Sequence, residues 1–544
     1  MKKRLLACVM IVAMVIGLTA CGDSETEVPV ATETTGEKIL SVQIGPDPET
    51  IDPALCSTID GANMILHSYE CLLTVDKDGL LAPGQAETWE KSADGLTWTF
   101  HLRDGLKWSD GTPLTANDFV YSWKRVCDPA IAAPYAETVL GMVDGYAEAI
   151  KGNTDALNVV AKDDQTLVVT LANQCSYFGS LAAFTTLSPV QQAAVEANSD
   201  AGTLDLKAYV SNGSFYVTEW VPGSHIMMSK NPNYWNADAV KLDKIKFNLM
   251  EDANEAYSAF QTGEVSMIKE IPAEEIYNLE GNPEYYVDTT IGTYYLSLNT
   301  EEEPFNNMNV RKALSLAIDR DYVANTIMQG TYSPAYNFLG PGWMDAEGTQ
   351  FIDNANGGET YISKDYEANL EEAKRLLIEA GYPNGDGLPT IIYSTNDQMY
   401  NKTFAEYLKQ TWGELGIGVT VEIVGWDSLT QMRRAGNYMV ARNGWSGDYS
   451  DPSNMLELLY STNGNNVGKY NNPEFDAAIE LSRTTTDEMA RFEALHIAED
   501  ILMDSAACIP VAYYNDFWLQ SEKVTGIRHS AYGYWYFMYA DIAE

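Results

Sequence analysis

The strongest constraint on the fold is a strand, helix, strand succession at residues 388–426. Residues 388–395 (LPTIIYST) and 416–426 (GIGVTVEIVGW) are rich in β-branched side chains, which is typical of strands. Residues 401–415 (NKTFAEYLKQTWGEL), between them, predict a helix. This order of elements is typical of a right-handed crossover between parallel strands, so we expect this part of the chain to be α/β.

An earlier stretch predicts antiparallel structure instead. Apolar side chains recur at period two within residues 86–113, and the same stretch contains three Asp-Gly pairs, which favour hairpin turns. Residues 115–126 (TANDFVYSWKRV) then change to helical spacing, with Thr115 as the N-cap and Asp118 at the third helical position. We interpret this region as a small α+β unit.

The remaining periodic segments alternate between the two kinds of structure. Residues 157–171 and 211–235 each predict two strands joined by a turn. Apolar spacing predicts amphipathic helices over 310–328 and 363–380. Residues 509–519 predict a late strand that is suited to a return of the chain to its first lobe.

The N-terminus has the pattern of a targeting segment. Basic residues at positions 2–4 precede an apolar run from Leu5 to about Leu18, which is too short to span a bilayer comfortably. The tetrad Leu18-Thr19-Ala20-Cys21 resembles the lipobox of bacterial lipoproteins. The resemblance implies that residues 1–20 are a signal peptide and that Cys21 receives lipid. The alternative is an ordinary signal peptide cut nearby, with no role for Cys21.

Residues 21–37 predict a flexible tether. They are polar, acidic and rich in Thr, with no apolar period. A flexible coil of this length reaches about 20 to 25 Å. We therefore expect a globular body that stays close to the membrane and is free to turn.

The cysteine count argues against a disulfide framework. Cys8 leaves with the signal peptide and Cys21 takes lipid, so an odd number remains and at least one thiol must be free. No C-x-x-C motif is present, so neither a zinc knuckle nor a redox pair is predicted. The five remaining cysteines are Cys56, Cys71, Cys127, Cys175 and Cys508.

The charge balance excludes one class of partner. The chain has 34 Lys and Arg against 77 Asp and Glu, a formal net charge of −43, which becomes −46 without the basic residues of the signal peptide. A field of this sign repels phosphate backbones and gains nothing from anionic lipid. We therefore expect no nucleic-acid partner, and membrane attachment through the Cys21 lipid alone.

Enzyme motifs are missing from the sequence. The five histidines form no H-E-x-x-H, and there is neither a G-x-S-x-G nor a phosphate-binding G-x-x-x-x-G-K-[ST] motif. The nearest approach, GWSG at 444–447, has Asp448 where an esterase elbow needs its last Gly. We expect no enzyme activity, no catalytic residue, no metal site and no cofactor.

One long stretch resembles a known family. Residues 86–125 (AETWEKSADGLTWTFHLRDGLKWSDGTPLTANDFVYSWKR) are similar to the signature of bacterial extracellular solute-binding proteins for oligopeptides, dipeptides and nickel. Further similar segments follow in the same order, so the resemblance covers nearly the whole mature chain and is strongest to the oligopeptide receptors. These segments are DPAIAAPYA (128–136), NGSFYVTEW (212–220), KNPNYW (230–235), TYYLSLNTEEEPFNNMNVRKALSLAIDR (293–320), GWSGDYSDPSNMLELLY (444–460) and YNNPEFDA (470–477).

The resemblance implies a two-lobed α/β fold of the periplasmic-binding-protein type (type II), with an additional small α+β domain. Ligand is enclosed when the lobes close. The expected boundaries place 38–70, 188–291 and 511–544 in lobe I, 71–187 in the additional domain and 292–510 in lobe II.

The resemblance also implies a set of ligand-binding residues. In the oligopeptide receptors, an Asp in G-W-x-x-D-Y takes the ligand α-ammonium, and the matching residue here is Asp448. Arg442 matches the Arg that meets the C-terminal carboxylate of short peptides. Trp445 and Trp426 match tryptophans of side-chain pockets. Tyr294 and Tyr295 match a run near the hinge, and strand alternation means that their phenols point in different directions.

Each assignment has a plain structural alternative. Asp448 could cap a turn, since Asp451-Pro452 follows closely, and Arg442 could belong to a structural ion pair. Both tryptophans could be core residues. The burial of each side chain and its polar partners distinguish a ligand-binding role from the structural alternative.

The function that the resemblance implies is capture of extracellular oligopeptides by a monomeric, lipid-anchored receptor on the outer face of the bacterial cytoplasmic membrane, or in the periplasm of a cell with an outer membrane. Its partners are the permease and ATPase of an ABC importer. The same scaffold could instead bind nickel, haem, an oligosaccharide or a signalling peptide. A secreted hydrolase and a surface adhesin are more distant alternatives.

Overall fold

The computed structural model describes residues 36–76, 80–197, 209–346, 348–358, 360–396, 399–449 and 451–543. The expected signal peptide, Cys21 and all but the last two residues of the expected tether lie outside the described residues. Residues Lys38–Glu544 form one compact unit. None of the helices in the described ranges has the length and apolar character that crossing a membrane requires.

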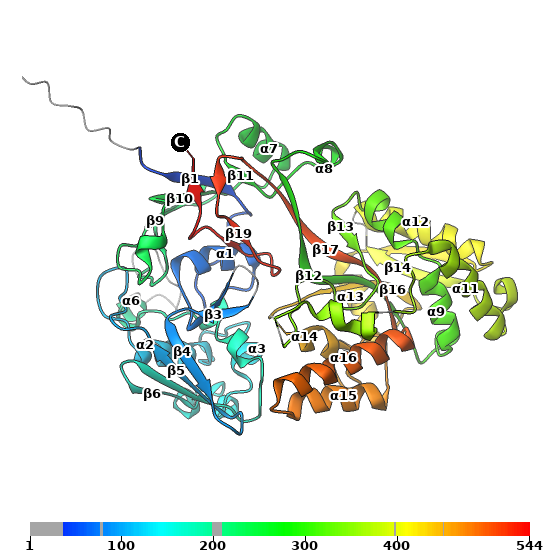
Figure 1. Ribbon diagram of the computed structural model, residues 1–544, viewed down its shortest axis with the longest axis horizontal. Coiled ribbons are helices and arrows are strands. Elements are labelled where there is room, and N and C mark those ends of the chain that lie inside the picture. The colour runs from blue at the N-terminus through cyan, green and yellow to red at the C-terminus, as the bar shows by residue number, and fades with distance from the viewer. Residues whose placement is uncertain are drawn as a thin grey trace, which may run out of the picture. The chain divides into compact units, whose positions relative to one another are not determined.

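Two long strands organise the largest sheet. β12 (Tyr285–Leu298) and β17 (Cys508–Gln520) pair antiparallel, and Figure 1 shows them running side by side between the region of β1 and the region of β14. The sheet has eleven strands and mixed direction. Beyond β12 lie β16 (Val440–Ser446), β14 (Ile391–Asn396) and β15 (Val419–Val424), and beyond β17 lie β11 (Met267–Ile268), β1 (Ile39–Gln43), β10 (Lys244–Asn248), β9 (His225–Lys230) and β8 (Phe215–Val221), with β13 (Tyr332–Pro334) also paired to β17.

The parallel crossover predicted at 388–426 is confirmed. β14 and β15 pair in parallel from Ile391 opposite Val419 onward, and α12 (Met399–Glu414) connects them. On α12, Phe404, Leu408 and Trp412 recur every four residues and are fully buried, which explains why the helix packs on the sheet.

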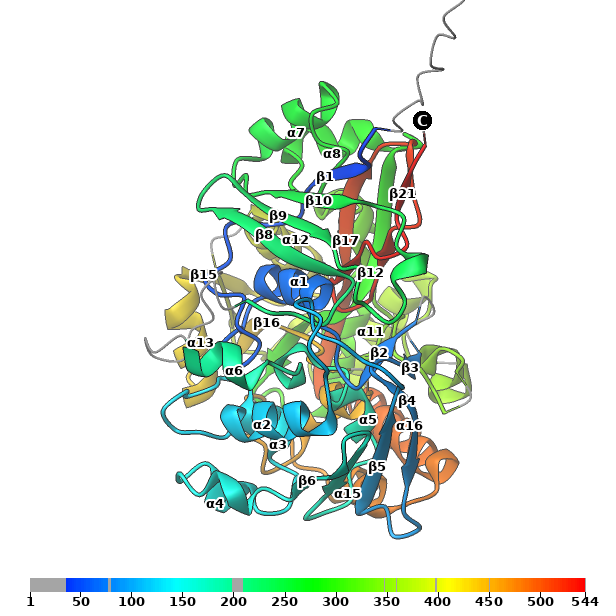
Figure 2. The ribbon, with the colours of Figure 1, turned by 90° about the vertical axis from the view of Figure 1, so that its left-hand side faces the viewer.

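The predicted α+β unit is also confirmed. A separate antiparallel sheet has the order β4 (Ala86–Lys91), β5 (Thr97–Leu102), β7 (Thr166–Thr170) and β6 (Val159–Asp163), and α2 (Ala116–Val126) lies beside it (Figure 2). Of the three Asp-Gly pairs, the first closes the β4–β5 hairpin, with Gly95 at φ +70°. The Thr115 N–H donates to the Asp118 carboxylate at 2.7 Å, as expected of the cap.

The hairpin predicted at 211–235 is present as β8 and β9, and the late strand is present as β17. The other helices are α1 (Ile59–Ser68), α3 (Ala136–Leu140), α4 (Tyr146–Ala149), α5 (Phe178–Leu181), α6 (Gln192–Ala197), α7 (Ala253–Gln261), α8 (Ala273–Ile276), α11 (Tyr366–Glu379), α13 (Trp426–Ala435), α14 (Ser453–Leu456), α15 (Pro473–Thr484) and α16 (Glu488–Ser505). Short strands are β2 (Leu73–Val75), β3 (Leu81–Pro83), β18 (Val524–Thr525), β19 (Arg528–His529), β20 (Trp535–Tyr536) and β21 (Asp541–Ile542).

The single helix predicted over 310–328 is wrong. α9 (Met308–Leu316) ends early, and α10 (Arg320–Tyr322) begins after a new N-cap, Asp319, whose carboxylate accepts the N–H of Tyr322 at 2.9 Å. The guanidinium of Arg320 is buried and donates to the Ser315 and Pro510 carbonyls, at 3.0 Å each. The apolar spacing continues through this break, so periodicity alone could not reveal it.

The apolar residues form several separate cores. The first core contains buried residues from 40 to 249 together with Trp518, Trp535 and Phe537 near the C-terminus. The second core is built around β12, β14 and α12, and the third around Phe338, Trp343, α15 and α16. The C-terminal segment therefore returns to the N-terminal part of the chain, as the late strand predicts.

The cysteine prediction is confirmed, and the structure goes further. The five cysteines after residue 37 are all described, and each is a buried free thiol. Burial raises the pKa of Cys71 and of Cys127 to about 12, so these thiols stay protonated at neutral pH.

Helix α11 offers a test of the local rules that place the elements. Its N-cap is Asp365, whose carboxylate accepts the Ala368 N–H at 3.1 Å. We expect Asp365→Ala to lower the free energy of unfolding by about 1 kcal/mol, as measured by urea denaturation. Glu371→Ala removes only an exposed ion pair with Lys374 on the same helix and serves as the control. Equal losses in the two variants would contradict the capping role.

Candidate ligand-binding site

Two strands that are far apart in the sequence form the floor of the site. β12 and β16 pair antiparallel, with Tyr295 opposite Asn443. Directly opposed residues share a face of the sheet, and so do residues two apart along one strand. Tyr295, Asn443 and Trp445 therefore lie on one face, whereas Tyr294 and Arg442 lie on the other.

A pocket of about 430 Å³ opens on the Tyr295 face. Four of the six predicted ligand residues line it, namely Asp448, Trp445, Trp426 and Tyr295. These residues come from β12, from the start of α13 and from the end of β16 with the loop that follows. The structure thus brings together residues that are up to 153 positions apart in the chain.

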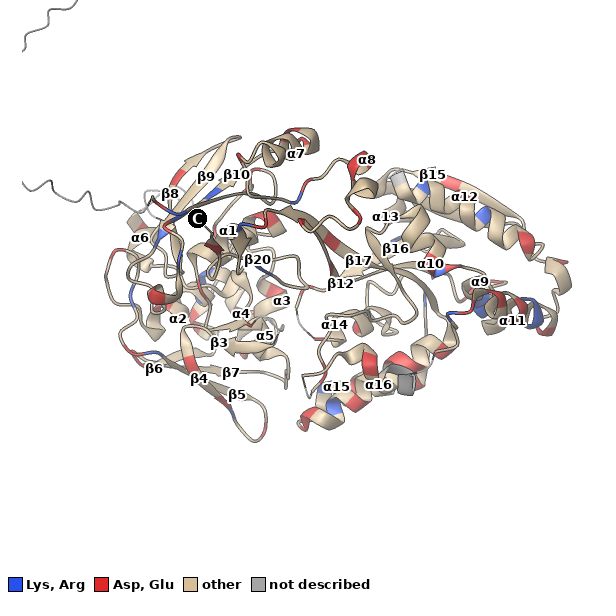
Figure 3. Ribbon diagram, turned by 45° about the horizontal axis from the view of Figure 1, so that its top comes forward, with Lys and Arg blue, Asp and Glu red and all other residues tan. Residues whose placement is uncertain are grey.

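The pocket carries charge of both signs. Asp448 is the one acidic side chain among the described residues that line it, and Arg433 and Arg434 of α13 contribute two guanidinium groups. Elsewhere acidic residues predominate, and Figure 3 shows them spread over helices such as α11, α15 and α16. A pocket with two guanidinium groups and a single carboxylate is therefore a local exception to the composition of the chain.

Asp448 is half-buried, and none of the described cationic side chains pairs with it. Burial raises the pKa of its carboxyl above the usual range, and a hydrogen bond with Asn454 offsets part of that shift. Within the part of the chain that the structure describes, no Lys, Arg or His forms an ion pair with this carboxylate. A desolvated carboxylate of this kind is stabilised by any cation that enters the pocket.

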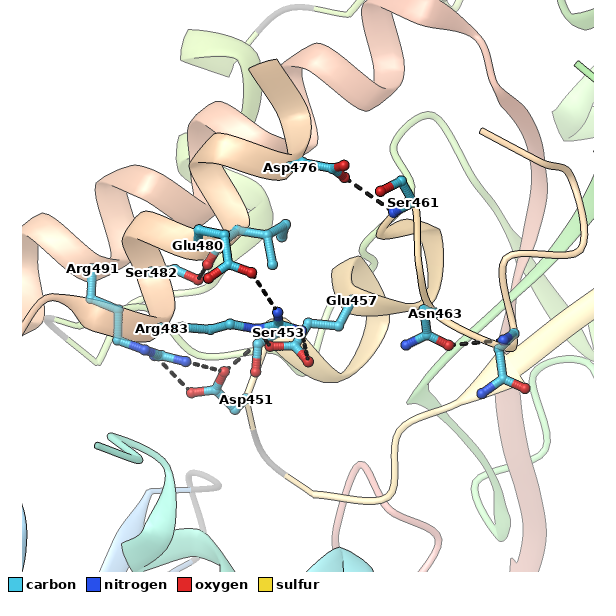
Figure 4. Close-up of polar contacts among 12 residues, drawn as sticks. Asp451, Ser453, Glu457, Ser461, Asn463, Asp476, Glu480, Ser482, Arg483 and Arg491 are labelled. Atoms are coloured by element: carbon cyan, nitrogen blue, oxygen red, sulfur yellow. Dashed lines mark hydrogen bonds and ion pairs between the residues drawn. The ribbon is translucent and has the colours of Figure 1, made fainter. Parts of the chain in front are cut away.

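The turn-capping role belongs to Asp451 rather than to Asp448. The Asp451 carboxylate accepts the Ser453 N–H at 3.0 Å and pairs with both terminal nitrogens of Arg491, at 2.6 and 2.9 Å (Figure 4). Both side chains of this ion pair are buried. Asp448 donates its backbone N–H to the Asn454 side chain at 3.4 Å, and its carboxyl also interacts with that side chain.

Arg442 lies outside the pocket lining, and none of the described carboxylates forms an ion pair with it. Its guanidinium carbon is 5.1 Å from the ring centroids of both Tyr294 and Trp426, and one terminal nitrogen donates to the Tyr514 hydroxyl at 3.4 Å. Its Nε is buried and has no hydrogen-bond partner among the residues that the structure describes. The described residues supply no carboxylate to Arg442, so the structural ion pair considered from the sequence is not seen among them.

The two tryptophans differ in their surroundings. Trp426 is 49% exposed, so it is not a core residue, and it lies near the guanidinium carbon of Arg433 at 5.2 Å. Trp445 packs against the third core and donates its indole N–H to Asn454 at 3.1 Å. The first is exposed beside the guanidinium groups of Arg433 and Arg442, and the second is part pocket wall and part core.

The two adjacent tyrosines are both buried. Tyr294 is 1% exposed and donates its hydroxyl to Asn401 at 3.0 Å within the second core, whereas Tyr295 is 4% exposed and packs edge-on against Phe338 in the third core. Their phenols point in different directions, as strand alternation predicts.

Sequence reasoning missed several residues of this site. The pKa values of Tyr135 and Tyr534 are raised mainly by burial, and the charge of Asp448 adds to both shifts, so their phenols are within electrostatic range of this carboxylate. They lie 313 positions before Asp448 and 86 after it, and no local pattern links the three. Arg433 and Arg434 are adjacent basic residues, but three other such pairs occur after residue 37, so this signal alone could not find them.

Comparison with known proteins agrees with this architecture. The pattern of the bacterial extracellular solute-binding proteins, family 5 Middle, matches residues 81–467. The oligopeptide-binding protein OppA of Bacillus subtilis is 33% identical over 546 residues, covering 99% of each chain.

Two solved structures have the same fold. The unliganded open form of the periplasmic murein tripeptide-binding protein MppA has a TM-score of 0.82 and 29% identity, covering 93% of this chain and 97% of that one. The Haemophilus influenzae OppA complex with RPPGFSPFR has a TM-score of 0.68 and 32% identity, covering 93% and 99%. By TM-score, the structure is therefore more similar to the open, unliganded MppA than to the OppA peptide complex, although the sequence identity is slightly higher with the latter.

Fold and pocket together define a two-lobed α/β solute-binding protein with an additional small α+β domain. The chain belongs to family 5 of the bacterial extracellular solute-binding proteins. That family is made up of solute-binding proteins rather than enzymes.

Proposed function

We propose that this protein is the substrate-binding component of an ABC importer and that it captures extracellular oligopeptides between its lobes. The observation that carries the proposal is the half-buried Asp448 carboxylate, which has no cationic partner among the described residues and lines the same pocket as Arg433 and Arg434. A peptide zwitterion supplies an ammonium for the carboxylate and a carboxylate for a guanidinium. The names of the relatives support the same ligand class.

The energetics require contacts to the groups that every peptide shares. Micromolar affinity corresponds to about 8 kcal/mol, and one main-chain hydrogen bond contributes only about 0.5 to 1.5 kcal/mol net. A receptor for varied sequences therefore needs several main-chain bonds, as in strand addition, together with a terminal ion pair. β12 and β16 form the floor of the pocket, and the Asp448 carboxylate lies just beyond the end of β16. Both features suit this arrangement.

Each predicted residue has a role in this proposal. Asp448 neutralises the ligand α-ammonium, and the unpaired guanidinium of Arg442 takes the C-terminal carboxylate of short peptides. Trp426 and Trp445 form flat walls against which different side chains and water fit. Tyr295 lines the pocket. Tyr294 supports Arg442, and both of these residues lie on the face of the sheet opposite to Tyr295.

The remaining parts of the chain complete the receptor. Residues 1–20 direct export, Cys21 carries lipid, and 21–37 tether the body to the extracellular face of the membrane. Lobe I comprises 38–70, 188–291 and 511–544, the additional domain 71–187, and lobe II 292–510. The second and third cores draw their buried residues from 291–512, which supports the limits of lobe II. The receptor acts as a monomer without enzyme activity and passes peptide to a permease with its ATPase.

The lipid anchor has a direct test. In cells that express the full chain, we expect labelled palmitate to be incorporated into the wild type and the protein to sediment with membranes. Cys21→Ser should lose both the label and the membrane fraction, whereas Cys56→Ser should lose neither. Label that persists in Cys21→Ser would show that the anchor lies elsewhere.

The ligand class is tested by calorimetry on the soluble body, residues 38–544. We expect heats of binding with tripeptides to pentapeptides and none with nickel, haem or oligosaccharides. Native mass spectrometry of protein purified from cells should show carried-over mass in the range of short peptides. Binding of one of the other solutes, with no response to any peptide, would overturn the proposal.

Peptide affinity should depend on pH through Asp448. Burial raises the pKa of this carboxyl in the free protein, and a bound ammonium lowers it again, so binding releases a proton on the acid side. We expect affinity to fall about tenfold for each pH unit below the pKa in the free protein, and to fall again above about pH 8 as the peptide amine loses its proton. Calorimetry from pH 4 to 9 measures the profile. Asp448→Asn should flatten its acid limb, and an unchanged limb would contradict the assignment.

A further inference from the structure

Asp448 lies where the chain passes from one apolar core to another. Before it, Trp445 packs against the third core; after it, Tyr449 packs against the first core. The Tyr449 ring stacks on Tyr177, with ring centroids 4.7 Å apart and planes within 9°. Tyr177 directly precedes α5, so this stack joins the segment 71–187 to the loop that carries the site carboxylate.

The two sequence neighbours of Asp448 are held by different parts of the molecule. The Gly447 N–H donates to the Ile291 carbonyl at 2.7 Å, which fixes the residue before Asp448 to the third core. The residue after it, Tyr449, is held by its stack on Tyr177. The direction of the carboxylate therefore depends on both contacts, because a side chain follows the backbone on either side of it.

Tyr177 also contacts the ion pair that anchors the following turn. The Arg491 guanidinium carbon is 6.0 Å from the Tyr177 ring centroid, and the same guanidinium pairs with Asp451 at 2.6 Å. Aromatic stacking and cation–π attraction both favour this position of the ring. Tyr177, a half-buried residue of the additional domain, thus contacts Tyr449, which directly follows Asp448, and Arg491, which pairs with Asp451 in the turn after it.

We propose that Tyr177 is a positioning residue for Asp448, through which the additional domain contributes to recognition of the ligand amine. This inference rests on the proposed function, because it presupposes that Asp448 meets an ammonium. It assigns a role in ligand recognition to a residue of the α+β domain that does not line the pocket. Loss of the stack leaves the carboxylate chemically intact but no longer held where the amine arrives.

The test compares a tripeptide with its N-acetylated form, which has no charge for Asp448 to meet. Calorimetry gives the ratio of the two affinities in the wild type and in Tyr177→Leu, Tyr177→Ala and Tyr177→Phe. We expect the ratio to fall about tenfold in Tyr177→Leu and Tyr177→Ala, mainly through weaker binding of the free amine. Tyr177→Phe keeps the ring and should keep the wild-type ratio.

Two further variants separate the possible failures. Tyr121→Ala removes a half-buried tyrosine of α2 in the same domain and should leave the ratio unchanged, even if stability falls. Asp448→Asn should bring the ratio close to one. A wild-type ratio in Tyr177→Leu and Tyr177→Ala, with a collapsed ratio in Asp448→Asn, overturns the positioning role and leaves the proposed function standing. A wild-type ratio in Asp448→Asn would show that the amine is bound elsewhere and overturns this inference, whereas the proposed function is overturned only if the wild type binds no peptide.

Discussion

Replacing Asp448 by Asn is expected to weaken binding of a free-amine tripeptide about 30-fold at pH 7, which corresponds to about 2 kcal/mol. The substitution keeps the shape of the side chain and its contact with Asn454 but removes the charge that offsets the ligand ammonium. The half-buried position makes the effect larger than that of a surface charge, because water screens the interaction less. Isothermal titration calorimetry measures it.

The control for this variant is Asp155→Asn. Asp155 is exposed and pairs with Lys124 in the additional domain, so the substitution changes the net charge by the same amount without touching the pocket. We expect its affinity for the tripeptide to match the wild type. Equal affinities for the wild type and Asp448→Asn would show that the amine is bound elsewhere.

Breaking the buried pair next to the site should have the largest effect on stability. Arg491→Met leaves the Asp451 carboxylate buried without its partner, and we expect the free energy of unfolding to fall by about 3 to 5 kcal/mol. Urea denaturation, followed by tryptophan fluorescence, measures the loss.

An exposed pair in the same helical hairpin provides the comparison. Arg483 pairs with Glu457 and Glu480 while remaining partly exposed, so Arg483→Met should cost about 1 kcal/mol or less. Combining Arg491→Met with Asp451→Leu should recover part of the stability, because no unpaired charge remains. Similar losses for Arg491→Met and Arg483→Met would contradict the structural importance of the buried pair.

Local patterns predicted the elements well because their causes are local. The β4–β5 hairpin follows from alternation and an Asp-Gly turn, and the crossover from β14 to β15 follows from two β-branched runs around a helix. The break between α9 and α10 was missed because apolar spacing continued across Asp319, although an Asp before a polar first turn was the available signal.

The site could be predicted only in part because register and distant segments form it. The resemblance to a family supplied all six candidate residues, and four of them line one pocket. The pairing of β12 with β16 places Arg442 and Tyr294 on the other face, and no pattern in either strand reveals that pairing. The nearness of Tyr135 and Tyr534 to Asp448 likewise depends on how the whole chain is arranged.

The distribution of charge fits a receptor that selects by ends rather than by sequence. The chain is strongly acidic overall, whereas the pocket combines one carboxylate with nearby guanidinium groups. In the proposed function, flat aromatic walls at Trp426 and Trp445 accept side chains of different shape.

The most direct measurement is calorimetry of the wild-type protein with a good tripeptide ligand and with the same peptide acetylated at its amino end. If Asp448 recognises the free amine, the acetylated peptide should bind at least about 30-fold more weakly at pH 7. If both peptides bind with the same affinity, the carboxylate is not the recognition group, and the account of this pocket is wrong.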